Sequence, residues 1–468
     1  MAHAAHSLFP RPARCGTLTV PGSVAGTGGT RHRKAGAEPD SEEAHVVDAD
    51  RTFVIVGGGL AGAKAAETFR SEGFTGRVIL ICDERDHPYE RPPLSKGYLL
   101  GNEERDSVFV HDRAWYARAE IELHLGQPAV QLDRAAKAVV LGDGARINYD
   151  KLLLATGAEP RRLDIPGTDL AGVHHLRRLA HAERLRGVLA SLGRENGHLV
   201  IAGAGWIGLE VAAAARSHGA EVTIVEPGAT PLHSVLGPEL GQLFTDLHQE
   251  HGVRFRFGAR LTEIIGQDGM VLAARTDDGE EHPAHSVLAA IGAAPRIALA
   301  EAAGLTLARR PPGGIAVDAA LRTSDPDIFA AGDVAAHEHP LLDVRVRVEH
   351  WANALNGGPA AARAMLGQEM VYDRVPYFFS DQYDLGLEYS GYAPPGSYDQ
   401  VLIRGDTGKR EFVAFWLADR RLLAGMNVNV WDVTDPIQRL IRSKRRLDPE
   451  ALADPAVPLE SLLASEQG

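Results

Sequence analysis

Cysteine is scarce in this chain: only Cys15 and Cys82 occur among 468 residues. Two distant cysteines cannot build a disulfide framework, and neither belongs to a Cys-x-x-Cys pair, so dithiol catalysis is excluded. This usage indicates a reduced, cytoplasmic protein in which a bound cofactor carries any redox chemistry. Long apolar runs are also missing, because no window approaches the roughly 18–20 apolar residues that cross a bilayer. The formal net charge of −13 argues against nucleic acid as a partner.

Residues 1–50 lack the features of a folded domain and of a secretory signal. They mix Ala, Gly, Pro, His and Arg, and an acidic stretch runs from Glu38 to Asp50. The apolar core of a secretory signal, roughly 7–15 residues, is absent. Arginines precede the first acid, as in mitochondrial presequences, but the Gly and Pro content opposes an amphipathic helix. We therefore predict a disordered leader.

Two glycine-rich loops are the strongest positive feature of the sequence. Both fit Gly-x-Gly-x-x-Gly, follow an apolar run and open an alanine-rich stretch that predicts a helix. In such a loop the first glycine permits a tight turn, and the second lets the backbone approach a pyrophosphate. The third glycine allows close packing of helix and strand, and the N–H groups at the helix N-terminus donate hydrogen bonds to the anion. The loops are Gly57-Gly58-Gly59-Leu60-Ala61-Gly62 and Gly203-Ala204-Gly205-Trp206-Ile207-Gly208. They predict two bound dinucleotides between which electrons pass.

Each loop lies in a strand–turn–helix–strand unit. In the first unit we expect strands at 53–56 and 77–82, with a helix from Leu60 to about Ser71. The second unit occupies about 198–225. This pattern is typical of a parallel α/β sheet.

A strand that runs into a glycine turn follows each unit. These segments are Lys151–Gly157 and Ser286–Gly292, and their recurrence predicts a duplicated domain. After about Gly367, alternating runs at 398–404 and 411–417 predict antiparallel strands. With a helix at about 436–442, they predict a C-terminal α+β domain.

Longer motifs carry a resemblance to a known family. They are Pro88-Tyr89-Glu90-Arg91-Pro92-Pro93-Leu94-Ser95-Lys96, Ala155-Thr156-Gly157 with Pro160-Arg161, Ala331-Gly332-Asp333, and Glu349-His350-Trp351. With these motifs the chain resembles, from Arg51 to Leu463, the flavin-dependent ferredoxin reductases of the putidaredoxin reductase and dioxygenase-reductase type. Apoptosis-inducing factor is a more distant relative of the same family.

The resemblance implies two Rossmann-like dinucleotide-binding domains, for FAD and NAD, and a C-terminal α+β interface domain. The FAD-binding domain is expected at 51–165 and 301–367, split around an NAD-binding domain at 166–300. The C-terminal domain is expected at 368–468, and the leader at 1–50. The order of segments read from the sequence agrees with this arrangement.

The resemblance also implies the residues of an FAD site. Either Asp83 or Glu84 bonds the FAD ribose; alignment favours Asp83, and the sequence leaves the choice open. Lys96 lies near flavin N5, where a cation stabilises the reduced ring. Asp333 bonds the ribityl chain or the pyrophosphate, and Val334 begins a helix directed at the pyrimidine. The other expected FAD contacts are Gly57, Gly59, Leu60, Ala61, Gly62, Arg91, Val130, Ala155, Thr156, Gly157, Arg161, Gly332, Glu349, His350 and Trp351.

An NAD site is implied around the second loop. There Trp206 covers the nicotinamide pocket and swings aside for the nucleotide, and Glu210 pairs with Lys96. Trp351 matches an aromatic residue beside the flavin, on the side that an iron–sulfur partner approaches. Lys96, Glu210, Trp206 and Trp351 are thus the catalytic candidates. The expected NAD contacts are Gly203, Gly205, Trp206, Ile207, Gly208, Glu226, Ile291 and Gly292.

The position of Glu226 predicts whether the protein prefers NADH or NADPH. It ends the second strand of its unit, where an acid roughly 20 residues after the loop accepts hydrogen bonds from the ribose hydroxyls. A carboxylate there repels the 2′-phosphate of NADPH, and the following residues 227–230 supply no arginine. We therefore expect NADH to be the donor.

The chain also departs from relatives and from disulfide reductases. Where relatives commonly have Phe-Trp-Ser-Asp-Gln, Phe379 replaces the tryptophan. The segment in which disulfide reductases of this fold carry their redox cysteines has none, and Cys82 is expected to be a small buried residue. No metal site is expected, because His248 and His251 share a helix face without a third ligand and are predicted to be a solvated pair.

The sequence as a whole predicts an NADH-dependent FAD enzyme that reduces a small, acidic iron–sulfur ferredoxin and feeds an oxygenase. Two alternatives stay open: another acceptor, such as rubredoxin, a quinone or a small oxidant, and an NADH-responsive binding protein like apoptosis-inducing factor. An acidic partner needs a basic docking face on this acidic chain. Candidates are Arg439, Arg442, Lys444, Arg445 and Arg446, unless these charges only complement a helix end.

Overall fold

The structure, a computed structural model, describes residues 49–464. Cys15 and almost all of the predicted leader therefore lie outside the described residues. No helix in the described part of the chain combines the length and the apolar character that a membrane crossing requires.

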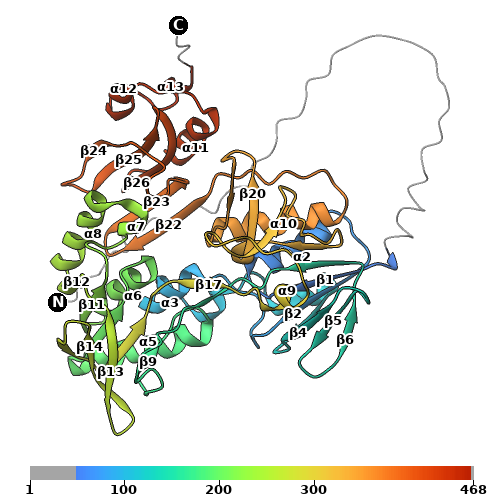
Figure 1. Cartoon of the computed structure of the whole chain (residues 1–468), viewed down its shortest axis with the longest axis horizontal. Helices are drawn as coiled ribbons and strands as arrows, with labels where there is room; N and C mark the ends of the chain where they lie inside the picture. Colours follow the sequence, from blue (N-terminus) through green and yellow to red (C-terminus); the bar gives the residue numbers. More distant parts are fainter. Residues whose placement is uncertain (1–48, 465–468) are drawn as a thin grey trace, which may run out of the picture. The chain divides into compact units, whose positions relative to one another are not determined.

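A five-stranded parallel sheet forms the centre of the first unit (Figure 1). Its strands, in spatial order, are β19 (Ile328–Ala330), β7 (Lys151–Leu154), β1 (Thr52–Val56), β2 (Arg77–Cys82) and β3 (Ile121–Leu125). The apolar run of β1 is buried along its length, as in a parallel sheet with covered faces. Helix α2 (Leu60–Ser71) and strand β2 have the predicted bounds.

The second unit repeats this sheet. Its parallel strands, in spatial order, are β12 (Val253–Phe257), β11 (Glu221–Glu226), β10 (His198–Ala202), β16 (Ser286–Ala289) and β9 (Val173–His174). Helix α6 (Trp206–Ser217) follows the second glycine loop as α2 follows the first. Each unit also carries a three-stranded antiparallel sheet. In the first unit it lies between β3 and β7 in the chain and consists of β4 (Ala129–Asp133), β5 (Ala138–Leu141) and β6 (Arg146–Asn148). In the second unit it lies between β12 and β16 and consists of β13 (Leu261–Gln267), β14 (Met270–Thr276) and β15 (Glu281–Pro283). The predicted duplication is confirmed.

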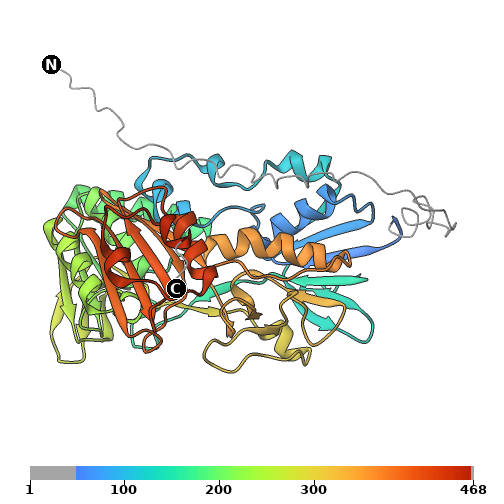
Figure 2. The ribbon, with the colours of Figure 1, turned by 90° about the horizontal axis from the view of Figure 1, so that it is seen from above.

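The chain returns to the first unit after completing the second. Strand β19 joins the edge of the first sheet beside β7. Helix α10 (Trp351–Met365) packs along α2, as Figure 2 shows. A Cβ on Gly358 would lie 2.2 Å from the carbonyl oxygen of Ala61, so only glycine permits this approach. The first unit is therefore built from two separate parts of the chain.

The helix expected from Val334 is wrong. Residues Gly332–Val334 form a single 3-10 turn, and β20 (Ala335–His339) follows. This strand pairs in parallel with β18 (Ile315–Val317) and antiparallel with β21 (Val344–Val346), so sheet pairing overrides the helical tendency of the alanines. The next helix is α10.

Two short strands link the nucleotide units. Strand β8 (Ala158–Pro160) leaves the first unit and β17 (Ala293–Pro295) returns to it, and the two pair antiparallel. The pairing is extended by the Arg161 N–H, which donates to Gly292 O at 2.9 Å, and by the Arg296 N–H, which donates to Gly157 O at 2.9 Å.

The C-terminal part is an antiparallel sheet with a helical cover, as predicted. Its strands, in spatial order, are β22 (Tyr377–Gln382), β23 (Leu385–Gly391), β26 (Arg421–Val428), β25 (Glu411–Ala418) and β24 (Gln400–Asp406). Helix α11 (Thr434–Ser443) packs Ile437, Leu440 and Ile441 against Phe415 and Leu417 of this sheet. The remaining helices are α3 (Gly97–Leu100), α4 (Arg113–Arg118), α5 (Leu179–Glu195), α7 (His233–Leu236), α8 (Pro238–Glu250), α9 (Ala298–Ala302), α12 (Pro449–Ala453) and α13 (Ser461–Ala464).

The glycines of the second loop should differ in what they tolerate. A Cβ on Gly208 would lie 2.2 Å from Gly203 O, whereas a Cβ on Gly205 would meet no atom within 4 Å. We expect Gly208→Ala to lower the free energy of unfolding by about 1–3 kcal/mol, because the backbone must shift. Gly205→Ser, which keeps an N-cap residue, should change it little. Thermal unfolding without added nucleotide tests this, and equal stability of the two variants would contradict it.

Candidate active site

The first glycine loop forms an open cradle. Gly57 has a φ of +127°, and a Cβ on it would lie 2.1 Å from Ala155 O. A Cβ on Gly62 would lie 2.1 Å from Gly57 O, which accounts for the close packing of helix and strand. Gly59 has no neighbour within 4 Å of a Cβ, and it begins α2 without a side-chain cap. The amides at this helix end are thus left for an anion.

The second loop has the same geometry. Gly203 has a φ of +99°, and a Cβ on it would lie 2.6 Å from Ala290 O. Gly205 is open and begins α6 without a side-chain cap. Both loops therefore present the features of a pyrophosphate site, one per unit.

The two units differ at the end of their second strand. In the sheet register, Ile81 pairs with Val56 as Val225 pairs with Ala202, so Cys82 occupies the position of Glu226. Glu226 accepts hydrogen bonds from the amides of Ala204 and Gly228, each at 2.7 Å. These two hydrogen bonds fix the Glu226 carboxylate beside the second glycine loop.

Cys82 fills the same place in the first unit without a charge. A Cβ on Gly58 would lie 2.3 Å from Cys82 Sγ, so the sulfur packs directly against the loop. Burial first, and then the charges of Asp83 and Glu84, raise the pKa of the Cys82 thiol to about 12. The thiol is therefore protonated and inert at neutral pH.

The acids that follow Cys82 are held by different partners. Asp83 lies 3.0 Å from Arg296 and 2.9 Å from Arg178. Burial opposes ionisation of Asp83, but these guanidinium groups offset it and hold its pKa below the ordinary value. Glu84 accepts from the Tyr89 hydroxyl at 2.6 Å and lies 3.4 Å from Arg91. Both acids stand at the first loop.

A buried ion pair joins the two units. Lys96 Nζ lies 2.7 Å from Glu210 Oε1, and these side chains are 15% and 3% exposed. The Ser380 hydroxyl donates to the same oxygen at 2.7 Å, and the Ser95 hydroxyl donates to the other. These three donors compensate a carboxylate that would be costly to bury alone. The contact implied by the resemblance is thus present.

Aromatic rings border this pair. Trp206 lies 5.8 Å from Phe244 and 5.0 Å from Phe378, between ring centroids. Lys96 Nζ lies 5.3 Å from the centroid of Phe379. Trp351 contacts the same ring edge-on at 6.1 Å. Phe379 thus contacts both the Lys96 ammonium and Trp351.

The Ala-Gly-Asp turn lies between two arginines. Asp333 Oδ2 accepts from Arg177 at 2.6 Å, and the backbone oxygen of Asp333 accepts from Arg347 at 3.1 Å. Arg347 also pairs with the exposed Glu349. His350, just before α10, is neutral because burial lowers its pKa to about 4.

Several expected nucleotide contacts carry exposed apolar side chains. Val130, Ile207 and Ile291 are 58%, 40% and 37% exposed. They lie next to the carboxyl-end loops of the two parallel sheets, where a dinucleotide would cover them. Thr156 is anchored by donating to Arg296 O at 2.8 Å, and Arg161 donates to Ala293 O at 3.2 Å.

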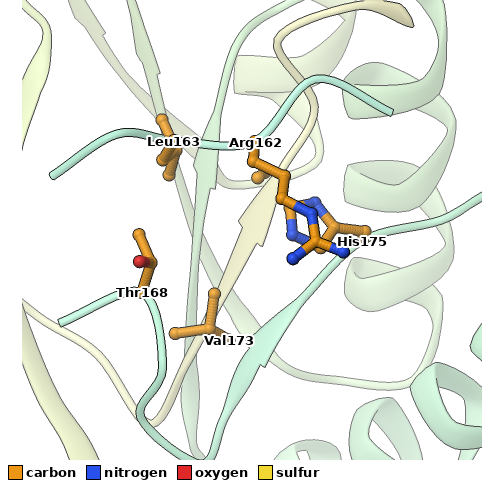
Figure 3. Close-up of a pocket in the computed structure, with 6 residues that line it drawn as sticks. Arg162, Leu163, Thr168, Val173 and His175 are labelled. Carbon is orange, nitrogen blue, oxygen red and sulfur yellow. The ribbon is translucent and has the colours of Figure 1, made fainter. Parts of the chain in front are cut away.

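A small enclosed pocket lies elsewhere in the second unit (Figure 3). It is lined by Arg162, Leu163, Thr168, Val173, His175 and Ala289. Its volume of about 60 Å³ is far below what a dinucleotide needs.

The expectation that His248 and His251 form a solvated pair is wrong for His248. His248 is fully buried rather than solvated: its Nε2 lies 2.9 Å from Gln382 Oε1. His251 stacks on Tyr383 with centroids 3.6 Å apart. Helix α8 packs against the C-terminal domain on this side, and the sequence of the helix alone does not show which of its faces is covered.

The basic residues near α11 are largely compensated. Arg439 pairs with Asp435 at 3.0 Å, and Arg442 with Asp373 at 2.8 Å. Arg446 pairs with Asp419 at 2.5 Å, and Arg445 donates a hydrogen bond to Leu463 O at 2.6 Å. This favours the helix-end interpretation over a dedicated docking face.

Several groups that surround the site were not predicted as site residues from the sequence. They come from segments without a recognisable motif, such as the run that contains Arg177 and Arg178, or they lie beside a recognised one. These residues are Ser95, Arg177, Arg178, His248, Arg296, Arg347, Ser380 and Gln382. Of these, Ser95 belongs to the recognised Pro88–Lys96 motif, Ser380 and Gln382 belong to the Phe-Phe-Ser-Asp-Gln segment, and His248 was considered only as a metal ligand.

Comparison with known proteins identifies the family. Residues 51–358 match the family described as pyridine nucleotide-disulphide oxidoreductase, and residues 377–463 match the one described as reductase C-terminal. The ferredoxin–NAD(+) reductase component of the anthranilate 1,2-dioxygenase system of Burkholderia cepacia is 39% identical over 412 residues, with 88% of this chain and 99% of the relative covered. Rhodocoxin reductase of Rhodococcus erythropolis is 38% identical, with 88% and 94% covered.

The fold agrees with these relatives. The solved structure of the covalent putidaredoxin reductase–putidaredoxin complex superposes with a TM-score of 0.84 at 34% identity, covering 89% of this chain and 99% of that chain. The resemblance inferred from the sequence motifs is confirmed. The chain belongs to the pyridine nucleotide-disulphide oxidoreductase family and carries its reductase C-terminal domain.

Proposed function

We propose that the protein is an NADH-dependent flavoenzyme that reduces a small iron–sulfur ferredoxin serving an oxygenase. The observation that carries this proposal is the buried Lys96–Glu210 pair, because it joins the two units that bear open dinucleotide loops. FAD and NAD(H) are the cofactors of this family, and the unobstructed Gly59 and Gly205 fit one dinucleotide each. The relatives are named as reductases of ferredoxins, and one solved structure holds putidaredoxin.

The residues of the first unit would hold FAD. The amides at the start of α2 bind its pyrophosphate, and Asp83 or Glu84 bonds the ribose. FAD held by these residues would supply a two-electron acceptor that can release its electrons singly. Lys96 supplies a fixed cation to the site, and Glu210 sets its direction. No acid–base side chain is needed for the hydride step itself.

The residues of the second unit would hold NADH. Glu226 bonds the adenosine ribose, and α6 presents its uncapped amides to the pyrophosphate. Trp206 lies against Phe378 of the C-terminal domain and must move for the nicotinamide to enter. The role of these residues would then be to orient the nicotinamide toward the flavin.

We propose FAD-binding parts at 51–165 and 301–367, an NAD-binding domain at 166–300 and an interface domain at 368–468. The crossing strands β8 and β17 and the return of β19 to the first sheet support this division. A cytoplasmic location is part of the same proposal, and the reduced, buried Cys82 supports it.

The acceptor can be tested directly. Protein reduced with NADH in the absence of oxygen should be reoxidised rapidly by an oxygenase-type ferredoxin in a stopped-flow measurement. A rubredoxin and a quinone serve as matched comparisons. Equal or faster reoxidation by either comparison would assign a different acceptor, and failure of all three would favour a binding protein.

The Lys96–Glu210 pair should govern flavin reduction. Lys96→Ala should slow reduction by NADH and leave Glu210 buried without a counter-charge, at a cost of roughly 3–5 kcal/mol in stability. Because the two groups act together, Lys96→Ala combined with Glu210→Ala should be no worse than either alone. Single-turnover reduction and thermal unfolding measure both effects. Strictly additive losses would show that the pair does not act as a unit.

Glu226 should set the preference for NADH. Both its oxygens are fixed by backbone amides, so the carboxylate cannot turn away from a 2′-phosphate. We expect kcat/KM to favour NADH by about tenfold or more, and Glu226→Arg to narrow or reverse this ratio. Glu221→Arg, at the other end of the same strand, is the control and should leave the ratio unchanged. Equal kcat/KM for both nucleotides in the unmodified protein would overturn the assignment.

A further inference from the structure

A row of buried polar side chains continues the Lys96–Glu210 pair into the interior. Its members are Glu210 of α6, Ser380 and Gln382 of β22, and His248 of α8. They are 4%, 1%, 1% and 0% exposed, respectively. Buried polar groups are costly unless they are hydrogen-bonded. Packing alone therefore does not explain a histidine and a glutamine at this depth.

Hydrogen bonds connect these side chains without a gap. His248 Nε2 lies 2.9 Å from Gln382 Oε1, and Gln382 Nε2 lies 3.1 Å from Ser380 Oγ. Ser380 Oγ lies 2.7 Å from Glu210 Oε1, the oxygen that also accepts from Lys96. At the outer end, the Tyr383 hydroxyl lies 3.4 Å from His248 Nδ1.

The donors and acceptors of these groups allow the hydrogen bonds of the row to run in only one direction. Burial lowers the pKa of His248 to about 4, so its ring is neutral and carries one N–H. With Nδ1 accepting from Tyr383, Nε2 donates to the amide oxygen of Gln382. The Gln382 amide then donates to Ser380, whose only proton is left for Glu210. Every donor in the row points toward the carboxylate.

We propose that His248 and Gln382 are positioning residues for the Lys96–Glu210 pair. They orient the Ser380 hydroxyl onto Glu210 Oε1, which holds the carboxylate in place and thereby aims the Lys96 ammonium. The row starts on a helix of the NAD-binding domain and passes through the C-terminal sheet, so both domains set the geometry of the pair. This inference rests on the proposed function, in which Lys96 acts at the flavin.

A double-mutant cycle tests whether His248 acts through Glu210. His248→Phe keeps the ring size and removes both hydrogen bonds. We expect it to slow flavin reduction by NADH about tenfold, the order of effect if Ser380, no longer oriented through Gln382, weakens its hydrogen bond to the charged Glu210. In the Glu210→Gln background the same substitution should have no further effect. An equal slowing in both backgrounds, or none in the unmodified protein, would overturn the proposal.

His251→Phe is the matched control for this cycle. It makes the same substitution beside the same Tyr383 ring but lies outside the row, so it should leave flavin reduction unchanged. If His248→Phe fails to fold, Gln382→Met replaces it in the double-mutant cycle. Methionine has a similar length to glutamine but cannot make the hydrogen bonds that connect His248 to Ser380.

A second measurement does not depend on turnover. In protein labelled with ¹⁵N-histidine, the His248 signal, assigned by its loss in His248→Phe, should show a neutral ring with the proton on Nε2 at neutral pH. A proton on Nδ1, or a charged ring, would reverse the row and overturn the proposal. Failure of ferredoxin to reoxidise the protein would contradict the proposed function and leave this result untouched.

Discussion

The carboxylate of Glu210 is the constraint on which the site depends. It is almost completely buried, and an isolated charge at that depth would unfold the surrounding structure or lose its ionisation. Its three partners come from two other parts of the chain: Lys96 and Ser95 from the first unit and Ser380 from the C-terminal sheet. The need to satisfy one carboxylate therefore fixes where three domains meet.

The duplicated units show how one fold takes on two roles. Their sheets, glycine loops and antiparallel inserts correspond strand by strand. At the end of the second strand, however, Glu226 holds a charge at the loop, whereas Cys82 presents a neutral sulfur. In the first unit the acids come later in the chain, at Asp83 and Glu84, and both form ion pairs with arginines.

The sequence predicted features that local chemistry dictates. The glycine loops, α2 and β2 follow from steric demands that a few neighbouring residues express, and the structure has them as expected. The Lys96–Glu210 contact was predicted only through resemblance, because no spacing rule joins residues so far apart. The helix expected at Val334 gave way to strand pairing, and burial of His248 came from a distant sheet. Tertiary contacts of this kind leave no local pattern.

The paired strands β8 and β17 have a mechanical consequence. Because the outgoing and returning segments are hydrogen-bonded to each other, the second unit is attached by a ribbon rather than by two independent tethers. A ribbon flexes readily across its face but resists sliding of one strand past the other, since sliding would break its hydrogen bonds. The second unit is therefore held in one register relative to the first.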